Sequence, residues 1–187
     1  MGARPGNEIT DEVTRWALAA RAGDPVAQAA FIRNTQLDVW RLAAALVDRR
    51  HADDLTQETY LRAFRALPSF QARATARTWL LGIARRVCAD HLRTVTRRRR
   101  VDALLRNQHS PHGGHVGATD PAVTLGVRDL LDRLDTRRRT AFALTQVLGL
   151  SYAEAAEVTG VPVGTIRSRV ARARADLVDA VRTAMAS

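Results

Sequence analysis

Residues 151–174 read SYAEAAEVTGVPVGTIRSRVARAR, and this stretch decides the fold at the C-terminal end of the chain. Ser151 and Glu154 have the spacing of a capping box, which predicts that a helix begins here. Gly160 can adopt the left-handed conformation that ends such a helix, and Pro162 suits the first turn of the next one. The stretch therefore predicts two short helices joined by a tight turn.

The second of these helices has an apolar side and a basic side. Ile166, Val170 and Ala173 share one face and are expected to pack inward. A helix-turn-helix with arginines on its outer side matches the unit that enters the DNA major groove, where arginine pairs with guanine edges or phosphates. A solvated basic surface helix is the alternative, but the cap, the turn and the arginine face agree and favour DNA binding. The side chains expected to be available to DNA are Thr165, Arg167, Ser168, Ala171, Arg172 and Arg174.

The composition is consistent with a polyanionic partner. The 187 residues carry a formal charge of +10, and all 29 basic residues are arginine. A single cysteine, Cys88, excludes an internal disulfide and a multi-cysteine zinc site. The chain has neither an apolar run long enough to cross a bilayer nor a signal peptide pattern, so we expect a cytoplasmic protein with no membrane partner.

The rest of the chain shows helical periodicity and no strand pattern. Thr10 and Asp11, the pair Asp24-Pro25, Asp53 and the pair Asp120-Pro121 are expected to start helices. The helices expected before residue 151 span about 11–22, 25–47, 53–67, 76–94, 121–134 and 136–148. The polar, glycine-containing stretch 97–120 begins with four arginines and is typical of a flexible linker. We predict an all-α fold with two small helical domains, 1–96 and 121–187, joined by the linker 97–120, the second containing the helix-turn-helix.

Two groups of residues could suggest other chemistry. Cys88, Asp90 and His91 resemble a nucleophile with its base, but Cys88 and His91 share an apolar stripe and no oxyanion motif accompanies them. His109, His112 and His115 are regularly spaced, but glycines surround them and no carboxylate accompanies them. We therefore expect no catalytic residue, no metal site and no cofactor, and so not an enzyme.

Three segments together resemble one bacterial family. They are DLTQETYLRAF (54–64), RTWLLGIARRVCADHLR (77–93) and GTIRSRVARAR (164–174). Their order and spacing resemble the extracytoplasmic-function (ECF) sigma factors, which have a region 2 domain, a linker and a region 4 domain. The resemblance implies an alternative sigma factor that binds bacterial core RNA polymerase, recognises −35 and −10 promoter DNA and promotes promoter opening for transcription initiation.

The resemblance also implies roles for individual residues. The helix from Asp53 would dock on the β′ clamp coiled coil through Asp54, Gln57, Glu58, Arg62 and Arg65, although the residues alone slightly favour a solvated face with a Glu58–Arg62 pair. The loop from Phe70 to Thr75 would capture a flipped base of the −10 element. The −10 set is Phe70, Gln71, Ala72, Arg73, Arg77, Arg85, Arg86 and Arg93, and the −35 set is the outward group of the second helix. Trp79 is assigned to the core rather than to strand separation, and region 4 would also contact the β flap tip.

Other classes of protein fit parts of the pattern. A DNA-binding regulator whose N-terminal helices dimerise would bind a pseudo-palindromic duplex without polymerase. An interaction module held by an antagonist is a third class, and an enzyme is the weakest option. An anti-sigma factor is a possible further partner of a sigma factor.

Overall fold

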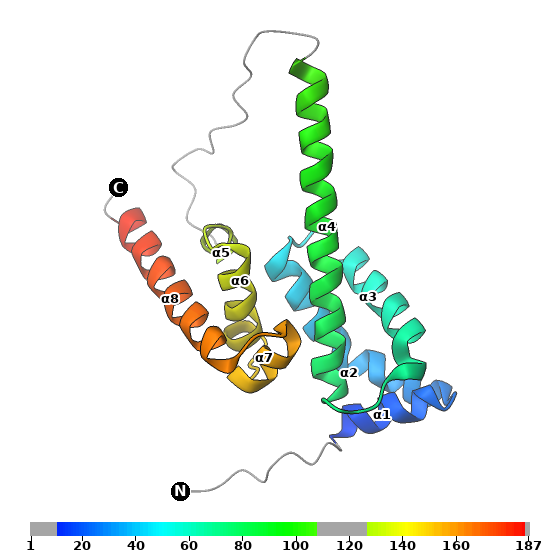
Figure 1. Cartoon of the computed structure of the whole chain (residues 1–187). Helices are drawn as coiled ribbons and strands as arrows, with labels where there is room; N and C mark the ends of the chain where they lie inside the picture. Colours follow the sequence, from blue (N-terminus) through cyan, green and yellow to red (C-terminus); the bar gives the residue numbers. More distant parts are fainter. Residues whose placement is uncertain (1–10, 108–126, 186–187) are drawn as a thin grey trace, which may run out of the picture.

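The computed structural model describes residues 11–107 and 127–185. Every regular element in these two ranges is helical and none is a strand, which confirms the all-α prediction. The helices form an N-terminal group, α1 to α4, and a C-terminal group, α5 to α8 (Figure 1).

The helix starts near the N-terminus follow the predicted caps, with one exception. Asp11 accepts a hydrogen bond of 2.6 Å from the Thr14 backbone N–H at the start of α1 (Glu12–Arg21). Asp24 accepts from the Val26 and Ala27 N–H groups at the start of α2 (Pro25–Leu46). The predicted cap Asp53 is wrong, because α3 (Ala52–Ala66) begins after His51. Asp53 lies in the first turn, where its carboxylate accepts a hydrogen bond of 2.9 Å from the Trp40 indole N–H.

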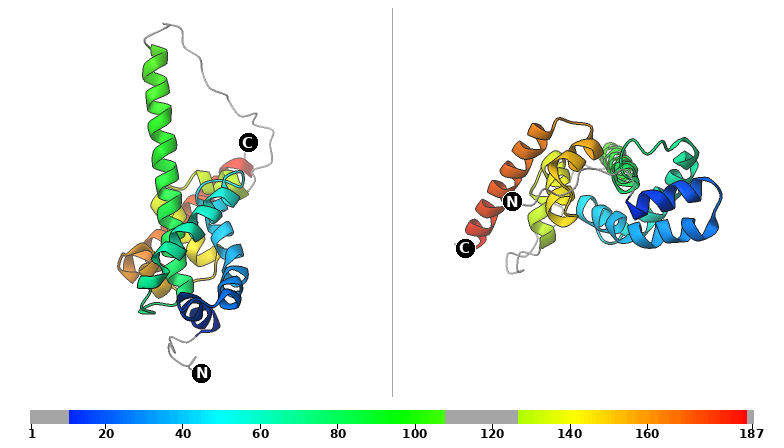
Figure 2. Two further views of the ribbon diagram at one scale, coloured as in Figure 1. Left: turned by 90° about the vertical axis from the view of Figure 1, so that its right-hand side faces the viewer. Right: turned by 90° about the horizontal axis from the view of Figure 1, so that it is seen from below.

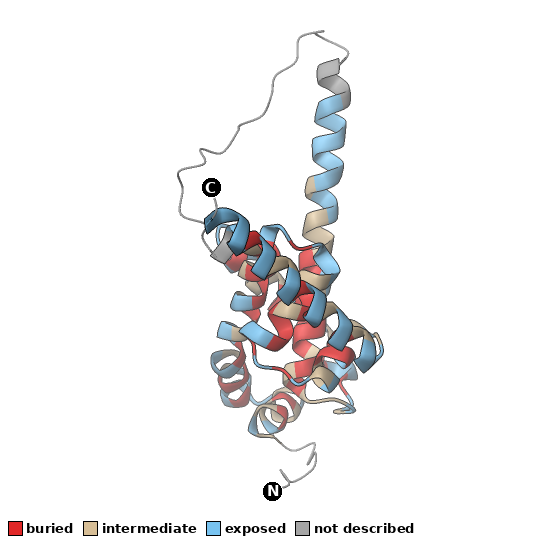
Figure 3. Cartoon of the chain, turned by 90° about the vertical axis from the view of Figure 1, so that its left-hand side faces the viewer, coloured by how far each residue is buried: buried red, intermediate tan, exposed pale blue. Residues whose placement is uncertain are grey.

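Helix α4 (Ala76–Asn107) is longer than the sequence prediction. The predicted end at Thr94 is wrong, because the helix continues through Arg97–Arg100. Arginine is a good helix former, and no glycine or proline interrupts residues 83–107. The first half of α4 is buried among other helices, whereas its second half projects from the body and is exposed (Figures 1 and 3). The three linker histidines and the Asp120-Pro121 start lie outside the described residues.

The C-terminal group confirms the helix-turn-helix. It contains α5 (Val127–Asp132), α6 (Thr136–Phe142), a π-helical turn η2 (Ala143–Val147), α7 (Tyr152–Thr159) and α8 (Val163–Met185). The Ser151 hydroxyl accepts from the Glu154 N–H at 3.2 Å, and the Glu154 carboxylate accepts from the Ser151 N–H at 2.8 Å. Gly160 has a φ of 70°, so it adopts the left-handed conformation that ends α7. The predicted capping box and turn are both present.

The two groups of helices share one continuous core. The largest fully buried side chains come from both groups and include Phe31, Leu42, Leu80, Leu144 and Ile166. Helix α4 lies between the groups and contacts α2 and α3 on one side and α7 on the other. Figure 2 shows α4 end-on between the two groups. The first helix of the helix-turn-helix therefore packs directly against the buried half of α4.

Candidate nucleic-acid and protein interfaces

Helix α8 presents the side chains that the sequence placed outside. Ile166, Val170 and Ala173 are buried against the other C-terminal helices, so the face opposite them is oriented outward. Thr165 is half-buried and accepts a hydrogen bond of 3.0 Å from Ser168 Oγ through its carbonyl. The exposed members of the set are Arg167, Ser168, Ala171, Arg172 and Arg174. The end of Arg174 donates to Gln146 Oε1 at 2.7 Å, so it is fixed beside η2.

The structure adds arginines to this face that the sequence analysis missed. A groove of about 500 Å³ lies between the start of α6 and α8. Arg138 is held in place by Asp135 at 2.9 Å and by Asp176 at 2.6 Å. Arg137 and Arg169 also line the groove beside Arg172, so basic groups of two helices converge there. The run TRRRT (136–140) was the available signal in the sequence.

The loop between η1 (Leu67–Ser69) and α4 is braced by neighbouring elements. The Phe70 ring is buried, and its centroid lies 4.8 Å from that of Trp79. Arg21 in α1 donates a hydrogen bond of 2.6 Å to the Phe70 carbonyl. Ala72 has a φ of 51°, a left-handed conformation that costs a non-glycine residue about 1–2 kcal/mol. The loop is therefore a defined structure with its backbone held in an uncommon conformation.

A cavity of about 340 Å³ opens beside this loop. Phe70, Gln71 and Arg73 line it together with Arg86 of α4, so the structure brings much of the predicted −10 set together. The half-buried Trp79 packs on the core and also contributes to the wall. Glu157 and Val158 of α7 form another part of the wall, although they are far from the loop in sequence. The C-terminal group thus borders the loop cavity.

Two predicted DNA-contacting arginines face the C-terminal group instead of solvent. Arg77 donates to Asp38 at 2.7 Å and to the Leu148 carbonyl at 2.8 Å. Arg85 donates to the Val158 carbonyl at 3.2 Å. Burial, together with the nearby charge of Arg86, lowers the pKa of Arg85 below its usual value. Arg86 and Arg93, in contrast, are exposed.

The outer face of α3 combines free and paired side chains. Asp54, Gln57 and Arg65 are exposed, and so is Leu61, which sequence analysis did not select. Arg62 donates to Glu58 at 2.6 Å, as the sequence predicted, and to Asp90 of α4 at 2.7 Å.

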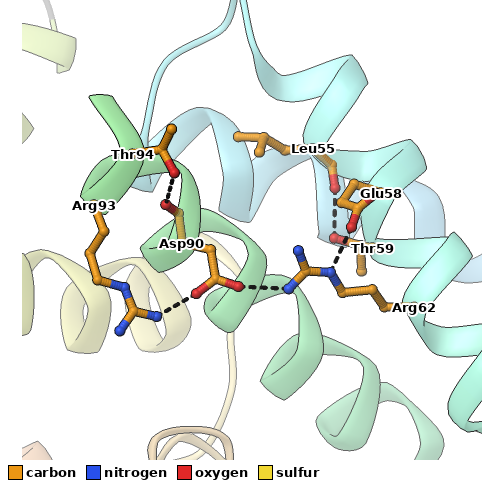
Figure 4. A network of polar contacts seen from close by, with 7 residues as sticks. All are labelled: Leu55, Glu58, Thr59, Arg62, Asp90, Arg93 and Thr94. Atoms are coloured by element: carbon orange, nitrogen blue, oxygen red, sulfur yellow. Dashed lines mark hydrogen bonds and ion pairs between the residues drawn. The ribbon is translucent and has the colours of Figure 1, made fainter. Parts of the chain in front are cut away.

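Figure 4 shows that Asp90 also pairs with Arg93, so one carboxylate joins two arginines. The hydrogen bond from Arg62 is the main cause that lowers the pKa of Asp90. Asp90 is therefore a further residue of this surface. It holds Arg62 against α4, an arrangement that no local pattern indicated.

Among the described residues, the candidate nucleophile Cys88 is buried and no metal site is formed. Cys88 is 1% exposed, and burial raises the pKa of its thiol to about 12, so it is not a thiolate nucleophile. The His91 ring lies 4.7 Å from that of His51. Residues 11–107 and 127–185 contain no group of three or more metal-ligating side chains placed to hold an ion. No helix within the same ranges is long and apolar enough to span a membrane.

Buried Cys88 gives the first testable prediction. Its pKa is raised from 9.0 to about 12, so its stabilising contribution is complete below pH 9 and is lost between pH 9 and 12. We expect the wild-type free energy of unfolding to fall faster in that window than that of Cys88→Ala, by up to about 1.4 kcal/mol per pH unit. Urea titrations of both proteins measure the difference. Equal slopes for the two proteins, or rapid modification of native Cys88 by a thiol reagent at pH 8, would contradict the prediction.

Comparisons with known proteins define the class of this two-part helical chain. The family model for Sigma-70 region 2 matches residues 31–107, and the model for Sigma-70, region 4 matches residues 125–177. The ECF RNA polymerase sigma factor SigC of Mycobacterium tuberculosis (strain CDC 1551 / Oshkosh) is 54% identical over 165 residues, covering 88% of each chain. The ECF RNA polymerase sigma-E factor of Haemophilus influenzae is 30% identical over 178 residues, covering 89% of this chain and 94% of the relative.

Solved structures show the same fold. CnrH, in complex with the cytosolic domain of CnrY, aligns with a TM-score of 0.70 at 24% identity, covering 92% of this chain and 99% of CnrH. The sigma factor RpoE of Bartonella quintana, in complex with the anti-sigma factor NepR, aligns with a TM-score of 0.59 at 24% identity, covering 81% and 94%. The chain belongs to the ECF RNA polymerase sigma factors. The resemblance seen in the sequence is confirmed, and the family consists of transcription initiation factors.

Proposed function

We propose that this sigma factor uses three separate surfaces to start transcription. The exposed face of α3 docks on the β′ clamp coiled coil of bacterial core RNA polymerase. The cavity beside the Phe70–Thr75 loop takes a base of the −10 element, and the outer face of α8 reads the −35 element. The observation that carries the proposal is that α8 exposes Arg167, Arg172 and Arg174 on the sides that do not carry its buried residues, inside the segment that matches Sigma-70, region 4.

The docking surface on α3 combines charge with one exposed apolar side chain. Asp54, Gln57 and Arg65 are free to meet charges on a partner helix, and Leu61 is 54% exposed beside them. The network of Glu58, Arg62 and Asp90 fixes the centre of this surface before any partner arrives. A pre-organised polar surface loses less side-chain entropy on binding, which favours a fast and specific encounter.

The −10 surface consists of a cavity and the arginines around it. A base that leaves the duplex needs a site that accepts its face and edge, and the cavity offers the Trp79 ring, Gln71 and Arg73. Binding only the unpaired base would shift the equilibrium between closed and open DNA towards the open form. The protein would therefore promote melting without making or breaking a covalent bond. For this reason we propose that it is not an enzyme.

The −10 and −35 surfaces must separate to engage one promoter. The two elements lie about 25 base pairs apart, or roughly 85 Å along B-DNA. In this structure Glu157 and Val158 of α7, the first helix of the helix-turn-helix, form part of the wall of the loop cavity. We propose that the contacts between α4 and α7 break on the promoter, freeing Arg77 and Arg85 for phosphates.

Domain limits and further partners follow from the same proposal. Residues 1–96 act as region 2 and residues 121–187 as region 4, and the first part of the segment between them, residues 97–107, belongs to helix α4. Region 4 also contacts the β flap tip, and the protein acts in the cytoplasm, where the polymerase is. The Bartonella relative was solved with an anti-sigma factor, which supports an anti-sigma factor as a partner of this chain too.

In vitro transcription tests the proposed function. Purified bacterial core polymerase and the protein are incubated with a library of randomised promoters, and the transcripts are sequenced. We expect initiation at templates that share both a −35 and a −10 sequence. If no template initiates while the protein alone binds a pseudo-palindromic duplex, the protein acts as a regulator and the proposal is wrong.

Arg167 tests how α8 reads DNA. If its guanidinium contacts a base edge in a bidentate manner, Arg167→Ala should cost about 1–3 kcal/mol at one promoter position and relax the preference there. A phosphate contact would instead weaken all promoters alike. Footprinting on single-base variants of a selected promoter separates these outcomes. The control is Arg182→Ala, because Arg182 lies in the last turn of α8, beyond the helix-turn-helix, and is also exposed.

A further inference from the structure

The projecting half of α4 carries a basic segment that the three proposed surfaces do not use. Residues 96–103 are all exposed, and the helix leaves the body before it reaches them (Figures 1 and 3). Within the described residues, none of the guanidinium groups of Arg97, Arg98, Arg99 and Arg100 makes an ion pair or a hydrogen bond. The nearest acid along the helix is Asp102. Among residues 11–107 and 127–185, no ion pair therefore compensates this charge.

Neither packing nor pairing explains why the segment carries this charge. Four consecutive arginines point in four directions around the helix axis, so the segment has no apolar face to bury. Arginines spaced three or four residues apart, such as Arg93 and Arg97, repel each other and weaken the helix. An anionic partner would relieve this repulsion.

Some of these arginines continue a row that begins at the loop cavity. Arg86, Arg93, Arg97 and Arg100 follow one another at intervals of seven, four and three residues, which places them within about 60° on one face of α4. We name these four residues the arginine row. Arg86 lines the −10 cavity, and Arg100 lies about 21 Å further along the helix axis. Arg98 and Arg99 lie on other sides of the helix.

We propose that the arginine row binds the phosphate backbone of the double-stranded DNA between the −10 and −35 elements. This inference depends on the proposed function, because it places the DNA by the −10 cavity. The row begins where the unpaired base would enter and leads away over a length equal to about six base pairs of duplex. Its side chains are arginines without an interleaved aromatic residue, which suits phosphates better than stacked single-stranded bases. Such binding would add affinity without adding sequence preference.

The salt dependence of binding tests the row with a matched control. Holoenzyme is assembled from core polymerase and each variant, and its binding to a selected duplex promoter fragment is measured over a range of salt concentrations. Each phosphate contact contributes about 0.9 to the slope of log K against log salt. Arg97→Gln/Arg100→Gln should reduce the magnitude of this slope by about 2. The control Arg98→Gln/Arg99→Gln removes the same charge from the other sides of the helix. It should reduce the magnitude of the slope by less than about half of that amount.

The outcomes separate this inference from the proposed function. Glutamine has a helix propensity close to that of arginine, so both variants should keep the helical circular dichroism of the wild type. If wild-type holoenzyme does not bind the promoter, the proposed function fails. If it binds and the two variants have equal slopes, the arginine row is overturned. The reduced slope of Arg97→Gln/Arg100→Gln should disappear when the spacer is single-stranded. If it persists there, or if it arises only after RNA has been made, the arginine row does not bind duplex DNA.

Discussion

Asp54→Arg is expected to abolish specific initiation while leaving the fold intact. Asp54 is exposed in the first turn of α3 and its carboxylate makes no hydrogen bond or ion pair with the described residues, so the folded chain loses little when it changes. Its loss from a helix N-terminus costs about 0.3–1 kcal/mol. Reversing a charge in a matched polar interface costs several kcal/mol, and about 3 kcal/mol corresponds to a roughly 100-fold loss of docking.

The measurement is in vitro transcription from a promoter that the wild-type protein selects. Glu12→Arg is the matched control, because Glu12 is an exposed acid in the first turn of α1 and the net charge changes equally. The control should initiate like the wild type, and thermal melting should show both variants folded. Full activity of Asp54→Arg would remove α3 from the polymerase interface while leaving the family membership untouched.

A covalent crosslink between α7 and the residues beside the Phe70–Thr75 loop should block promoter opening as severely as Asp54→Arg blocks initiation. Ser69 and Glu157 are both exposed and line the same cavity of about 340 Å³, so Ser69→Cys and Glu157→Cys lie within reach of a short bis-maleimide. A crosslinked protein cannot place region 2 and region 4 roughly 85 Å apart. When geometry forbids both modules from binding together, the gain from linking them, about 100-fold or more, is lost.

The reference is the same double-cysteine protein treated with a monofunctional maleimide. It carries comparable adducts on both cysteines, so the two samples differ only in the covalent link. Native Cys88 is buried and should not react. We expect initiation by the crosslinked sample to be roughly 100-fold below the reference. If the two samples initiate equally, the closed arrangement is compatible with an open promoter, and the proposed separation is wrong.

The features that the sequence determined are those encoded over a few residues. The capping box of Ser151 and Glu154, the left-handed Gly160 and the caps at Asp11 and Asp24 each depend on atoms within one helical turn. The inward face of α8 follows from helical periodicity in the same way. These local signals predicted the all-α class and the side of α8 that faces outward. They failed at the end of α4, because a run of arginines resembles a linker in composition although each arginine favours helix.

Contacts between residues distant in sequence were decided only by the tertiary structure. Asp90 meets Arg62 across 28 positions, Arg77 meets the Leu148 carbonyl across 71, and Arg85 meets the Val158 carbonyl across 73. No local pattern specifies which distant carbonyl or carboxylate an arginine will reach. The packing of α7 against α4 determines these partners. It buries both helices in one core and brings the loop cavity beside the helix-turn-helix.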